Sequence, residues 1–369
     1  MVELLENRRD RLVATSGFRV AATAFPLTRP IARSRALALF ELCAGVPRAQ
    51  LLFAAVRLDL PELLLREGPL DADAIAARLS LPSAAARTLC RGAAAIGLLR
   101  ECRGRFALGP LGTALCDDPG LAAMVLHGGT ALPRDLADPV VLLRDGAGGS
   151  VLERFWPYAA PRERDGDGGA GEAGSYSALM AATQPAIARE ALRAAPFGRF
   201  RRLLDVGGGN GAFLEAVLRR HRRLRGAVLD LPPVAALAAA RFRAAGLSDR
   251  AVGLPGNFRH DPLPAGFDAV SLNRVLHDHD DQTVLALLRA VRAALPPRGT
   301  LLVIEPMAGA DPAGRATESY FGLYLRAMGG GRPRRDVEYA AMLRAAGFRR
   351  VRALRTRLPL VTRVLMARP

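Results

Sequence analysis

The chain has 369 residues, half of them hydrophobic, which is enough for two domains with sizeable cores. Its formal net charge of +17 comes from arginine alone, because the sequence contains no lysine. No uninterrupted apolar run approaches the roughly 20 residues that span a bilayer, and the N-terminus lacks the basic-then-apolar order of a signal peptide, so we expect a cytoplasmic protein or one peripheral to a membrane.

The excess of arginine admits several explanations. Nucleic acid, an anionic membrane or an acidic partner could each bind a chain of this charge. A coding bias towards GC-rich codons, which would enrich arginine and alanine together, explains it as well as any function does. Charge alone therefore leaves the partner open.

The first 40 residues form an extension punctuated by arginine, in which the segment 25–30 breaks any continuous helix because it contains two prolines. A small helical domain is expected from residue 41 onward. Asp71 is placed to cap one helix, and a second helix is expected over 84–96. Two short apolar stretches around Gly104 then predict a hairpin. Helix, turn, helix and hairpin together predict a winged helix.

Winged helices often bind DNA, and the positive charge adds to that expectation. A recognition helix normally presents several polar side chains to base edges. The second helix offers only Arg87 and Arg91 and otherwise consists of alanine, leucine and small residues. Packing is therefore its expected role. We expect no nucleic-acid partner, and DNA binding stays as the alternative.

The rest of the chain alternates apolar strands with amphipathic helices. A glycine-rich stretch over 161–174 is expected to be a mobile surface loop, and a helix begins at Ser175. The alternation predicts an α/β fold, a Rossmann-like, doubly wound and mostly parallel sheet that binds ligands at its carboxyl edge. The expected strands are 203–206, 226–229, 267–272, 301–304, 349–356 and 361–367. The expected regions are an extension over 1–40, a winged-helix domain with the loop over 41–174, and a ligand-binding domain over 175–369.

The strand at 203–206 leads into a glycine-rich turn, residues 207–211, and a helix leaves it. Glycines let a backbone turn tightly and approach a ligand that a Cβ would repel. About twenty residues further on, Asp230 ends the next apolar run, where a carboxylate can hold two ribose hydroxyls. The pattern predicts a site for a nucleoside cofactor.

Two cofactors fit this turn. A dinucleotide site reads G-x-G-x-x-G, and Ala212 at the third glycine position is an accepted variant, so NAD stays open on the turn alone. Asp205 immediately precedes the glycines, and a carboxylate there repels phosphate but suits a cation. S-adenosylmethionine carries an ammonium and a sulfonium and no phosphate. The turn therefore favours S-adenosylmethionine and a methyltransferase.

A histidine follows the strand at 267–272. His277 is expected in the crevice where substrate meets cofactor, and imidazole is the side chain best suited to take a proton near neutral pH. Glu305 ends the neighbouring strand, so its carboxylate is expected to orient the His277 ring. Glu305 could instead be a loop anchor.

Two other roles for the histidine segment stay open. His277 or His279 could cap the helix that begins at Asp280, although the aspartate is the better cap. The segment could also bind a metal, but His277 and Asp278 are adjacent and cannot readily share one ion. We expect no metal, and the four cysteines show no C-x-x-C spacing, which predicts reduced core residues.

These motifs, in this order, resemble those of small-molecule O-methyltransferases of the plant caffeate and hydroxyindole type. With the winged helix, the resemblance covers roughly residues 41–369. It implies a homodimer formed through the winged-helix domain, S-adenosylmethionine as methyl donor with S-adenosylhomocysteine as product, and no required metal. The motifs that carry it are Asp205–Gly209, Leu229–Pro232, Arg274–Asp278 and Ile304–Glu305.

The resemblance also implies roles for single residues. The turn would surround the methionine part of the cofactor, the second acidic motif its ribose and a third motif its adenine. His277 would be the base and Glu305 its partner. The cofactor residues implied are Asp205, Gly207, Gly209 and Asn273, then Asp230 and Leu231, then Asn257 and Phe258.

Three departures from the family pattern stand out. Asn257 occupies a position where aspartate is usual, although an amide can still donate and accept hydrogen bonds to a purine. His279 occupies a position where tryptophan is common. A second glutamate that often supports the base falls on Pro333, so that Glu305 alone would steer His277.

Several stretches are similar to the carotenoid O-methyltransferases of purple bacteria, namely 25–33, 39–42, 175–180 and 328–334. This similarity implies an acceptor with a tertiary 1-hydroxyl, as in hydroxyneurosporene and demethylspheroidene, and contacts to it from Tyr176 and Met180. Such a polyene lives in a membrane, so the arginine-rich extension could dock on anionic lipid headgroups.

The sequence therefore predicts an S-adenosylmethionine-dependent O-methyltransferase that acts on a hydroxylated carotenoid, with His277 as general base. Two other functions stay open. The same chemistry could serve a phenolic or other aromatic natural product. Alternatively, the chain could be a winged-helix regulator that binds DNA and responds to S-adenosylmethionine without transferring its methyl group.

Overall fold

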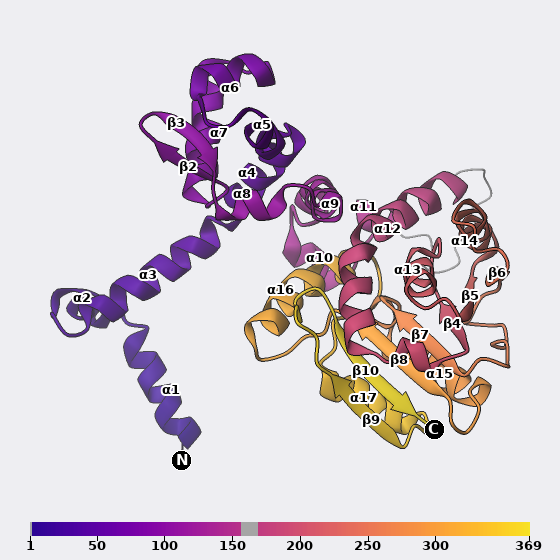
Figure 1. Ribbon diagram of the computed structural model, residues 1–369. Helices are drawn as coiled ribbons and strands as arrows, with labels where there is room; N and C mark the ends of the chain where they lie inside the picture. The colour runs from indigo at the N-terminus through magenta and orange to yellow at the C-terminus, as the bar shows by residue number, and fades with distance from the viewer. Residues whose placement is uncertain (1, 156–168) are drawn as a thin grey trace. The chain divides into compact units, whose positions relative to one another are not determined.

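The computed structural model describes residues 2–155 and 169–369, and the side chains of residues 6–154 and 179–369. Contacts divide the chain into two compact units, Met1–Asp117 and Asp118–Pro369. Figure 1 shows the helical first unit and the second unit with its sheet. Both units contain buried hydrophobic side chains.

The first unit begins with helices separated by short breaks. Residues 25–28 interrupt the helices as expected, because Phe25 has an extended backbone and Pro30 lies in the first turn of the next helix. Among the residues that the structure describes, no single helix is long and apolar enough to cross a bilayer, and only α3 and α4 together, bent by 51°, reach that length and composition. The helices are α1 (Val2–Val13), α2 (Ser16–Ala24), α3 (Arg29–Cys43), α4 (Gly45–Arg57) and α5 (Leu60–Glu67).

A winged helix completes the first unit and confirms that prediction. The Asp71 carboxylate accepts a hydrogen bond of 2.7 Å from the backbone N–H of Ala74, so it caps the first of two packed helices. The hairpin turns at Gly104, whose φ of +75° suits glycine. The elements are β1 (Leu70–Asp71), α6 (Ala72–Leu79), α7 (Ser83–Ala95), β2 (Leu99–Cys102), β3 (Arg105–Leu108) and α8 (Pro110–Leu115), with strand order β1-β3-β2.

The second unit is built on a seven-stranded sheet with the order β6-β5-β4-β7-β8-β10-β9, in which β10 is antiparallel to both neighbours and the other pairs are parallel. This is the predicted mostly parallel, doubly wound sheet. Its strands are β4 (Arg202–Val206), β5 (Arg225–Asp230), β6 (Ala251–Pro255), β7 (Ala269–Asn273), β8 (Thr300–Glu305), β9 (Arg350–Leu354) and β10 (Arg363–Arg368).

Strand β6 was not predicted, and its position explains why. It is an edge strand, where Gly253 and Pro255 are tolerated because one side of the strand makes no backbone hydrogen bonds to a neighbouring strand. Gly253 also lets helix α14 approach, since a Cβ there would overlap the carbonyl oxygen of Ala235. Sequence patterning weights glycine and proline as turn signals, so such a strand is passed over.

Helices cover both faces of the sheet. Side chains of α12, α13 and α14 pack with one face, and those of α15 and α17 pack with the other. A smaller cluster joins α9, α10, α11 and α16. The elements are α9 (Pro119–Asp135), α10 (Pro139–Asp145), α11 (Val151–Phe155), α12 (Gly169–Ala194), η1 (Phe197–Arg199), α13 (Ala212–Arg220), α14 (Pro232–Ala244), η2 (Leu276–Asp278), α15 (Asp281–Ala294), α16 (Pro312–Ala327) and α17 (Asp336–Ala345).

The division between the units differs from the expected boundary at residue 174. It falls after Asp117, and α9, α10 and α11 belong to the second unit because they pack with α12 and α16. Helix α12 begins at Gly169 rather than at Ser175, so the end of the expected loop is helical. Residues 161–168 of that loop lie outside the described residues.

The contact between α14 and β6 yields a test of the fold. Gly253→Ala is expected to lower the free energy of unfolding by about 1–3 kcal/mol, because the added Cβ forces the helix away from the strand. Gly322→Ala on α16 is the matched control: its Cβ would meet no atom within 4 Å, and alanine favours a helix by about 0.5–1 kcal/mol. Urea unfolding measures both, and equal midpoints for the two variants would contradict the packing described.

Candidate active site

The carboxyl edge of the sheet carries the glycine-rich turn between β4 and α13. Gly207 and Gly209 have φ values of +67° and +59°, which glycine adopts without strain. Gly211 has φ +78°, and a Cβ there would lie 2.6 Å from the Phe242 ring. The turn therefore requires glycine for its backbone shape and for close packing against α14.

Asp230 ends β5 next to this turn. One carboxylate oxygen accepts from the N–H of Gly209 at 2.8 Å, and the other accepts from the N–H of Leu231 at 2.8 Å. The side chain thus fixes the tip of the turn while remaining at the ligand-facing edge.

Asp205 is fully buried at the end of β4, beneath the turn. Burial raises the pKa of its carboxyl to about 7, and the nearby Asp230 charge adds to this, although a hydrogen bond of 2.6 Å from Ser271 opposes it. Its second oxygen would lie 2.5 Å from a Cβ on Gly208. Asp205 is therefore in contact with the turn but does not line the cavity above it.

An open cavity lies over the turn, with about 670 Å³ of empty space that includes open solvent at its mouth. It brings together five of the residues predicted from the sequence: Met180, Gly207, Gly209, Phe258 and Asn273. The other residues on its wall are Ala181, Gln184, Gly208, Asn210, Ala212, Phe213, Arg274, Val275, Asp278 and His279.

Four predicted cofactor residues lie outside this wall: Asp205, Asp230, Leu231 and Asn257. The side-chain oxygen of Asn257 accepts from the N–H of Arg259 at 3.0 Å, so it shapes the loop after β6 that carries Phe258. The side chain of Tyr176 falls outside the described residues.

Two buried acceptor atoms fit the ammonium of S-adenosylmethionine. Asn273 lines the cavity, and its side-chain oxygen has no hydrogen-bond partner among the described residues. One carboxylate oxygen of Asp205, beneath the turn, also has no hydrogen-bond partner among them. Buried acceptors normally find a donor. An acceptor-rich floor under a glycine turn suits an ammonium, whereas a pyrophosphate would add negative charge beside Asp205.

His277 lies in the short helix η2, directly after β7, and is 7% exposed. Its Nδ1 contacts Oε2 of Glu305, at the end of β8. The other oxygen of Glu305 accepts from the N–H groups of Val275 and Leu276 at 2.9 and 2.7 Å. Both expected roles of Glu305 thus apply, since it anchors the loop and orients the ring.

The structure corrects the expectation that Glu305 alone would steer the ring. Nε2 of His277 lies 3.0 Å from Oδ1 of Asp278, which also lines the cavity. Sequence reasoning weighed Asp278 only as a metal ligand, because adjacent residues rarely face one another. The tight turn of η2 permits the contact. The sequence signal that could have predicted it is an aspartate directly after the candidate base.

The two carboxylates determine the charge of the ring. Burial lowers the pKa of His277, but the charges of Asp278 and Glu305, and the hydrogen bonds to them, outweigh burial and raise it to about 10. The imidazole is therefore held as the cation at neutral pH, and once deprotonated it is a stronger base than a free histidine.

The alternatives of capping and metal binding can be compared with this geometry. Asp280 caps α15 by accepting from the N–H of Thr283 at 2.8 Å, so His277 is not the cap. Across residues 2–155 and 169–369, no three histidine, cysteine, aspartate or glutamate side chains gather as metal ligands.

His279 lies on the cavity wall against Phe258, with ring centroids 5.4 Å apart. Burial lowers its pKa to about 4, and the charges of Arg259 and His277 add to this, although Asp278 and Asp280 oppose it. His279 is therefore neutral, and its ring packs edge-on against Phe258 as an aromatic side chain would.

Aromatic side chains of α16 pack beside His277, and sequence reasoning missed them. The Phe321 ring lies 5.8 Å from that of His277, and it contacts Tyr320 and Tyr324. Tyr324 shares a hydrogen bond of 3.0 Å with His127 of α9. The available signal was three aromatic residues within five positions of one helix, although nothing in their spacing connects them to the strand ends.

The chain matches two family models, an O-methyltransferase dimerisation domain over residues 40–118 and an O-methyltransferase domain over residues 158–349. A demethylspheroidene O-methyltransferase from Cereibacter sphaeroides is 42% identical over 93% of this chain and 89% of its own length. One from Rhodobacter capsulatus is 40% identical over 93% of this chain and 84% of its own length.

The fold also matches solved structures. The calicheamicin biosynthesis methyltransferase CalO1, solved with S-adenosylhomocysteine bound, has a TM-score of 0.74 and 28% identity, and the match covers 91% of this chain and 98% of that one. The domain models, the relatives and the cofactor cavity agree, and they decide against a regulator that transfers no methyl group. The chain belongs to the S-adenosylmethionine-dependent O-methyltransferases.

Proposed function

We propose that this enzyme methylates the tertiary 1-hydroxyl of a carotenoid of the demethylspheroidene or hydroxyneurosporene type. The observation that carries the proposal is a buried histidine held between two carboxylates beside the cofactor cavity. The names of two relatives at 42% and 40% identity support the polyene acceptor. A tertiary alcohol is a weak acid, so its methylation needs a strong, well-placed base.

We infer the arrangement of the cofactor from the same residues. Gly207, Gly209 and Asn273 would surround the methionine part, with an acceptor oxygen of Asp205 beneath them. Asp230 and Leu231 would hold the ribose, and Asn257 with Phe258 the adenine. Bound S-adenosylmethionine supplies an electrophilic methyl group on a sulfonium.

The chain's own residues would do the rest. Nε2 of His277 would take the hydroxyl proton as the oxygen receives the methyl group, with S-adenosylhomocysteine as the leaving group, and Glu305 would hold Nδ1 so that the ring keeps its direction. Because the alcohol is far less acidic than imidazolium, proton removal is concerted with transfer, and orientation supplies much of the acceleration. Asp278 contacts Nε2 and also lines the cavity, so its carboxylate would lie near the acceptor hydroxyl.

The acceptor would lie on the α16 side of His277. Tyr320 and Tyr324 stack on each other there, and Phe321 packs edge-on against both; such an aromatic surface suits a flat conjugated chain. Met180, on the cavity wall, packs with the same cluster and would contact the acceptor, together with Tyr176.

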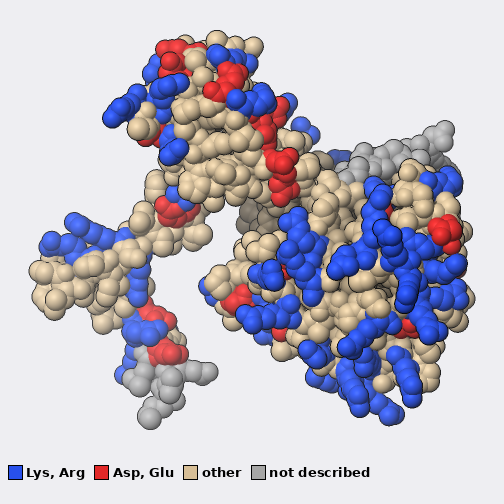
Figure 2. Space-filling view, viewed as in Figure 1, with Lys and Arg blue, Asp and Glu red and all other residues tan. Residues whose placement is uncertain are grey.

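The dimerisation domain indicates a homodimer. We further propose that the extension contacts an anionic lipid surface, where the polyene is found. Apolar side chains of α2 and α3 and the segment between them are exposed, and Figure 2 shows arginines beside a broad uncharged surface there. The exposed large apolar residues are Phe18, Val20, Phe25, Leu27, Ile31, Leu37, Leu39, Phe40 and Leu42.

Removing the base tests the mechanism. His277→Ala should lower turnover of a detergent-dispersed 1-hydroxycarotenoid by about 10²–10⁴-fold. Affinity for S-adenosylhomocysteine, measured by calorimetry, should be unchanged, since the His277 ring does not line the cavity. His260→Ala, at an exposed histidine of the same unit, is the control. Full turnover by His277→Ala would remove this residue from the mechanism.

The raised pKa of His277 predicts the pH dependence. Because the ring must be neutral to accept a proton, kcat/KM should rise about tenfold per pH unit above neutrality and level off near pH 10. Asp278→Asn removes a charge that raises the pKa, so its profile should level off at lower pH. A profile that is flat above pH 7 in the wild type would contradict a base flanked by two carboxylates.

Lipid contact has its own test. Replacing Arg19, Arg33 and Arg35 with glutamine should weaken binding to phosphatidylglycerol vesicles about 100-fold in a co-sedimentation assay, since each surface arginine contributes about 1 kcal/mol. The control replaces Arg220, Arg222 and Arg223, exposed in the second unit, for the same change in charge. Equal weakening by both sets, or a change of oligomeric state in the first, would overturn lipid docking by the extension.

A further inference from the structure

Arg334 is an arginine that the proposed mechanism does not use, although it is completely buried. It lies in the segment Gly331–Arg335, between α16 and α17, more than fifty residues from the loop that carries His277. A buried guanidinium is costly unless its donors are all directed at acceptors. The hydrogen-bond acceptors around Arg334 therefore indicate its role.

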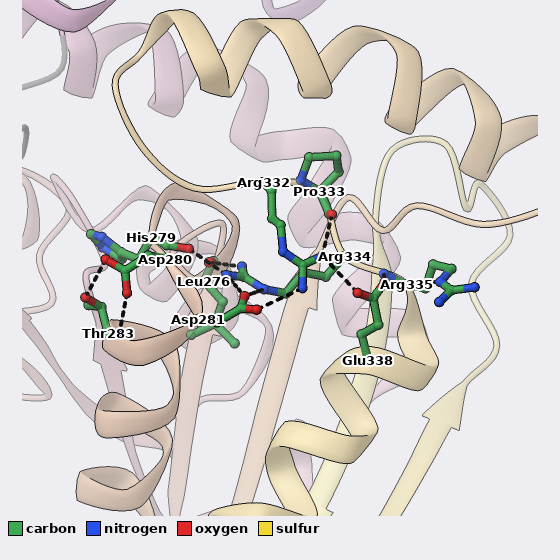
Figure 3. A network of polar contacts seen from close by, with 10 residues as sticks. All are labelled: Leu276, His279, Asp280, Asp281, Thr283, Arg332, Pro333, Arg334, Arg335 and Glu338. Atoms are coloured by element: carbon green, nitrogen blue, oxygen red, sulfur yellow. Dashed lines mark hydrogen bonds and ion pairs between the residues drawn. The ribbon is translucent and has the colours of Figure 1, made fainter. Parts of the chain in front are cut away.

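The partners lie on both sides of His277. Nη1 of Arg334 donates to the carbonyl of Leu276 at 2.8 Å, and Nη2 donates to the carbonyl of His279 at 2.7 Å. Nε and Nη2 both donate to Oδ1 of Asp281, at 2.8 and 2.6 Å. Figure 3 shows this guanidinium among Leu276, His279 and Asp281. The neighbouring side chains of Arg332 and Arg335 bond Glu338.

The backbone of the same segment holds His277 directly. The N–H of Arg332 donates to the carbonyl of His277 at 2.9 Å. Gly331 has φ +76°, and a Cβ there would overlap that carbonyl oxygen. The segment Gly331–Arg335 and the loop that carries His277 are therefore in direct backbone contact, with no room for a side chain at residue 331. Three hydrogen-bond acceptors, the carbonyls of Leu276, His277 and His279, are thus fixed by one segment.

The loop needs such support because its own conformation is strained. Arg274, three residues before the histidine, has φ +54°, which costs a non-glycine residue of order 1 kcal/mol or more. The ring of His277 must also stay aligned with carboxylates from two sources, Glu305 on β8 and Asp278 on η2. Glu305 fixes the start of the loop, and Arg334 fixes its middle and its end.

We propose that Arg334 is a positioning residue for the catalytic base, which it holds in register with Glu305 and Asp278 by clamping the carbonyls before and after it. The segment therefore acts on His277 through the backbone, although Pro333 supplies no carboxylate to the ring. This inference rests on the proposed role of His277.

The decisive experiment compares Arg334→Lys with Arg335→Lys. Lysine keeps the charge but cannot reach two carbonyls and Asp281 together, because it lacks the planar fork of a guanidinium. Arg335 is the matched control: it is the adjacent arginine, 60% exposed, and its side chain bonds Glu338 at the surface. Asp281→Asn, at a side chain that is 59% exposed, weakens the same clamp and serves if Arg334→Lys fails to fold.

The first readout is titration of the His277 ring by nitrogen-15 NMR in the complex with S-adenosylhomocysteine, which needs no acceptor. The carboxylates of Asp278 and Glu305 contact the ring, Phe321 packs beside it, and His279 interacts with its charge. We expect Arg334→Lys to lower the pKa of this ring by about one unit or more, because misalignment weakens both carboxylate contacts. Arg335→Lys should leave it unchanged, and Asp281→Asn should lower it by less.

The second readout is kcat with whichever acceptor the wild type methylates. A displacement of about 1 Å costs about 100-fold, so Arg334→Lys should lose about that factor while its affinity for S-adenosylhomocysteine is kept. An unchanged ring pKa and kcat in a folded variant would overturn the clamp. So would parallel loss of cofactor affinity and kcat, which marks a merely structural residue. Failure of the wild type to methylate a carotenoid would count against the proposed substrate, and the NMR result would still decide the clamp.

Discussion

The candidate active site depends on one buried carboxylate. Glu305 is completely inaccessible, and its two oxygens bond the ring of His277 on one side and the N–H groups of Val275 and Leu276 on the other. A buried charge is tolerated only where such partners surround it. The shape of the loop, the direction of the His277 ring and the protonation of that ring are therefore coupled, because all three depend on the Glu305 carboxylate.

Features that depend on the order of strands could be predicted from the sequence, whereas contacts that depend on loop conformation could not. Parallel strands meet at one edge, so Asp205, Asp230 and Glu305 could be placed there from strand ends alone. Asp278 could not, since its contact with Nε2 of His277 requires the tight turn of η2 after a residue with positive φ. Arg334 reaches its carbonyl partners over 58 and 55 positions, a distance that local patterning does not span.

Cofactor and acceptor are served by different parts of the second unit. The glycine turn, the loop after β6 and the end of β7 form the cofactor cavity, and these elements follow the general logic of the sheet. In the proposed arrangement, the acceptor side would be supplied by aromatic residues of α16 and by α9, which lie outside the strand-and-helix alternation. Variation of those helices could change the acceptor while the transfer chemistry is kept.

The most direct test of the central claim is to locate the transferred methyl group. Purified protein would be incubated with labelled S-adenosylmethionine, a detergent-dispersed 1-hydroxycarotenoid and, in parallel, a catechol. The proposed function predicts a labelled ether on the carotenoid. Label on the catechol and none on the carotenoid would contradict the proposed substrate and leave the histidine mechanism in place for a phenolic acceptor.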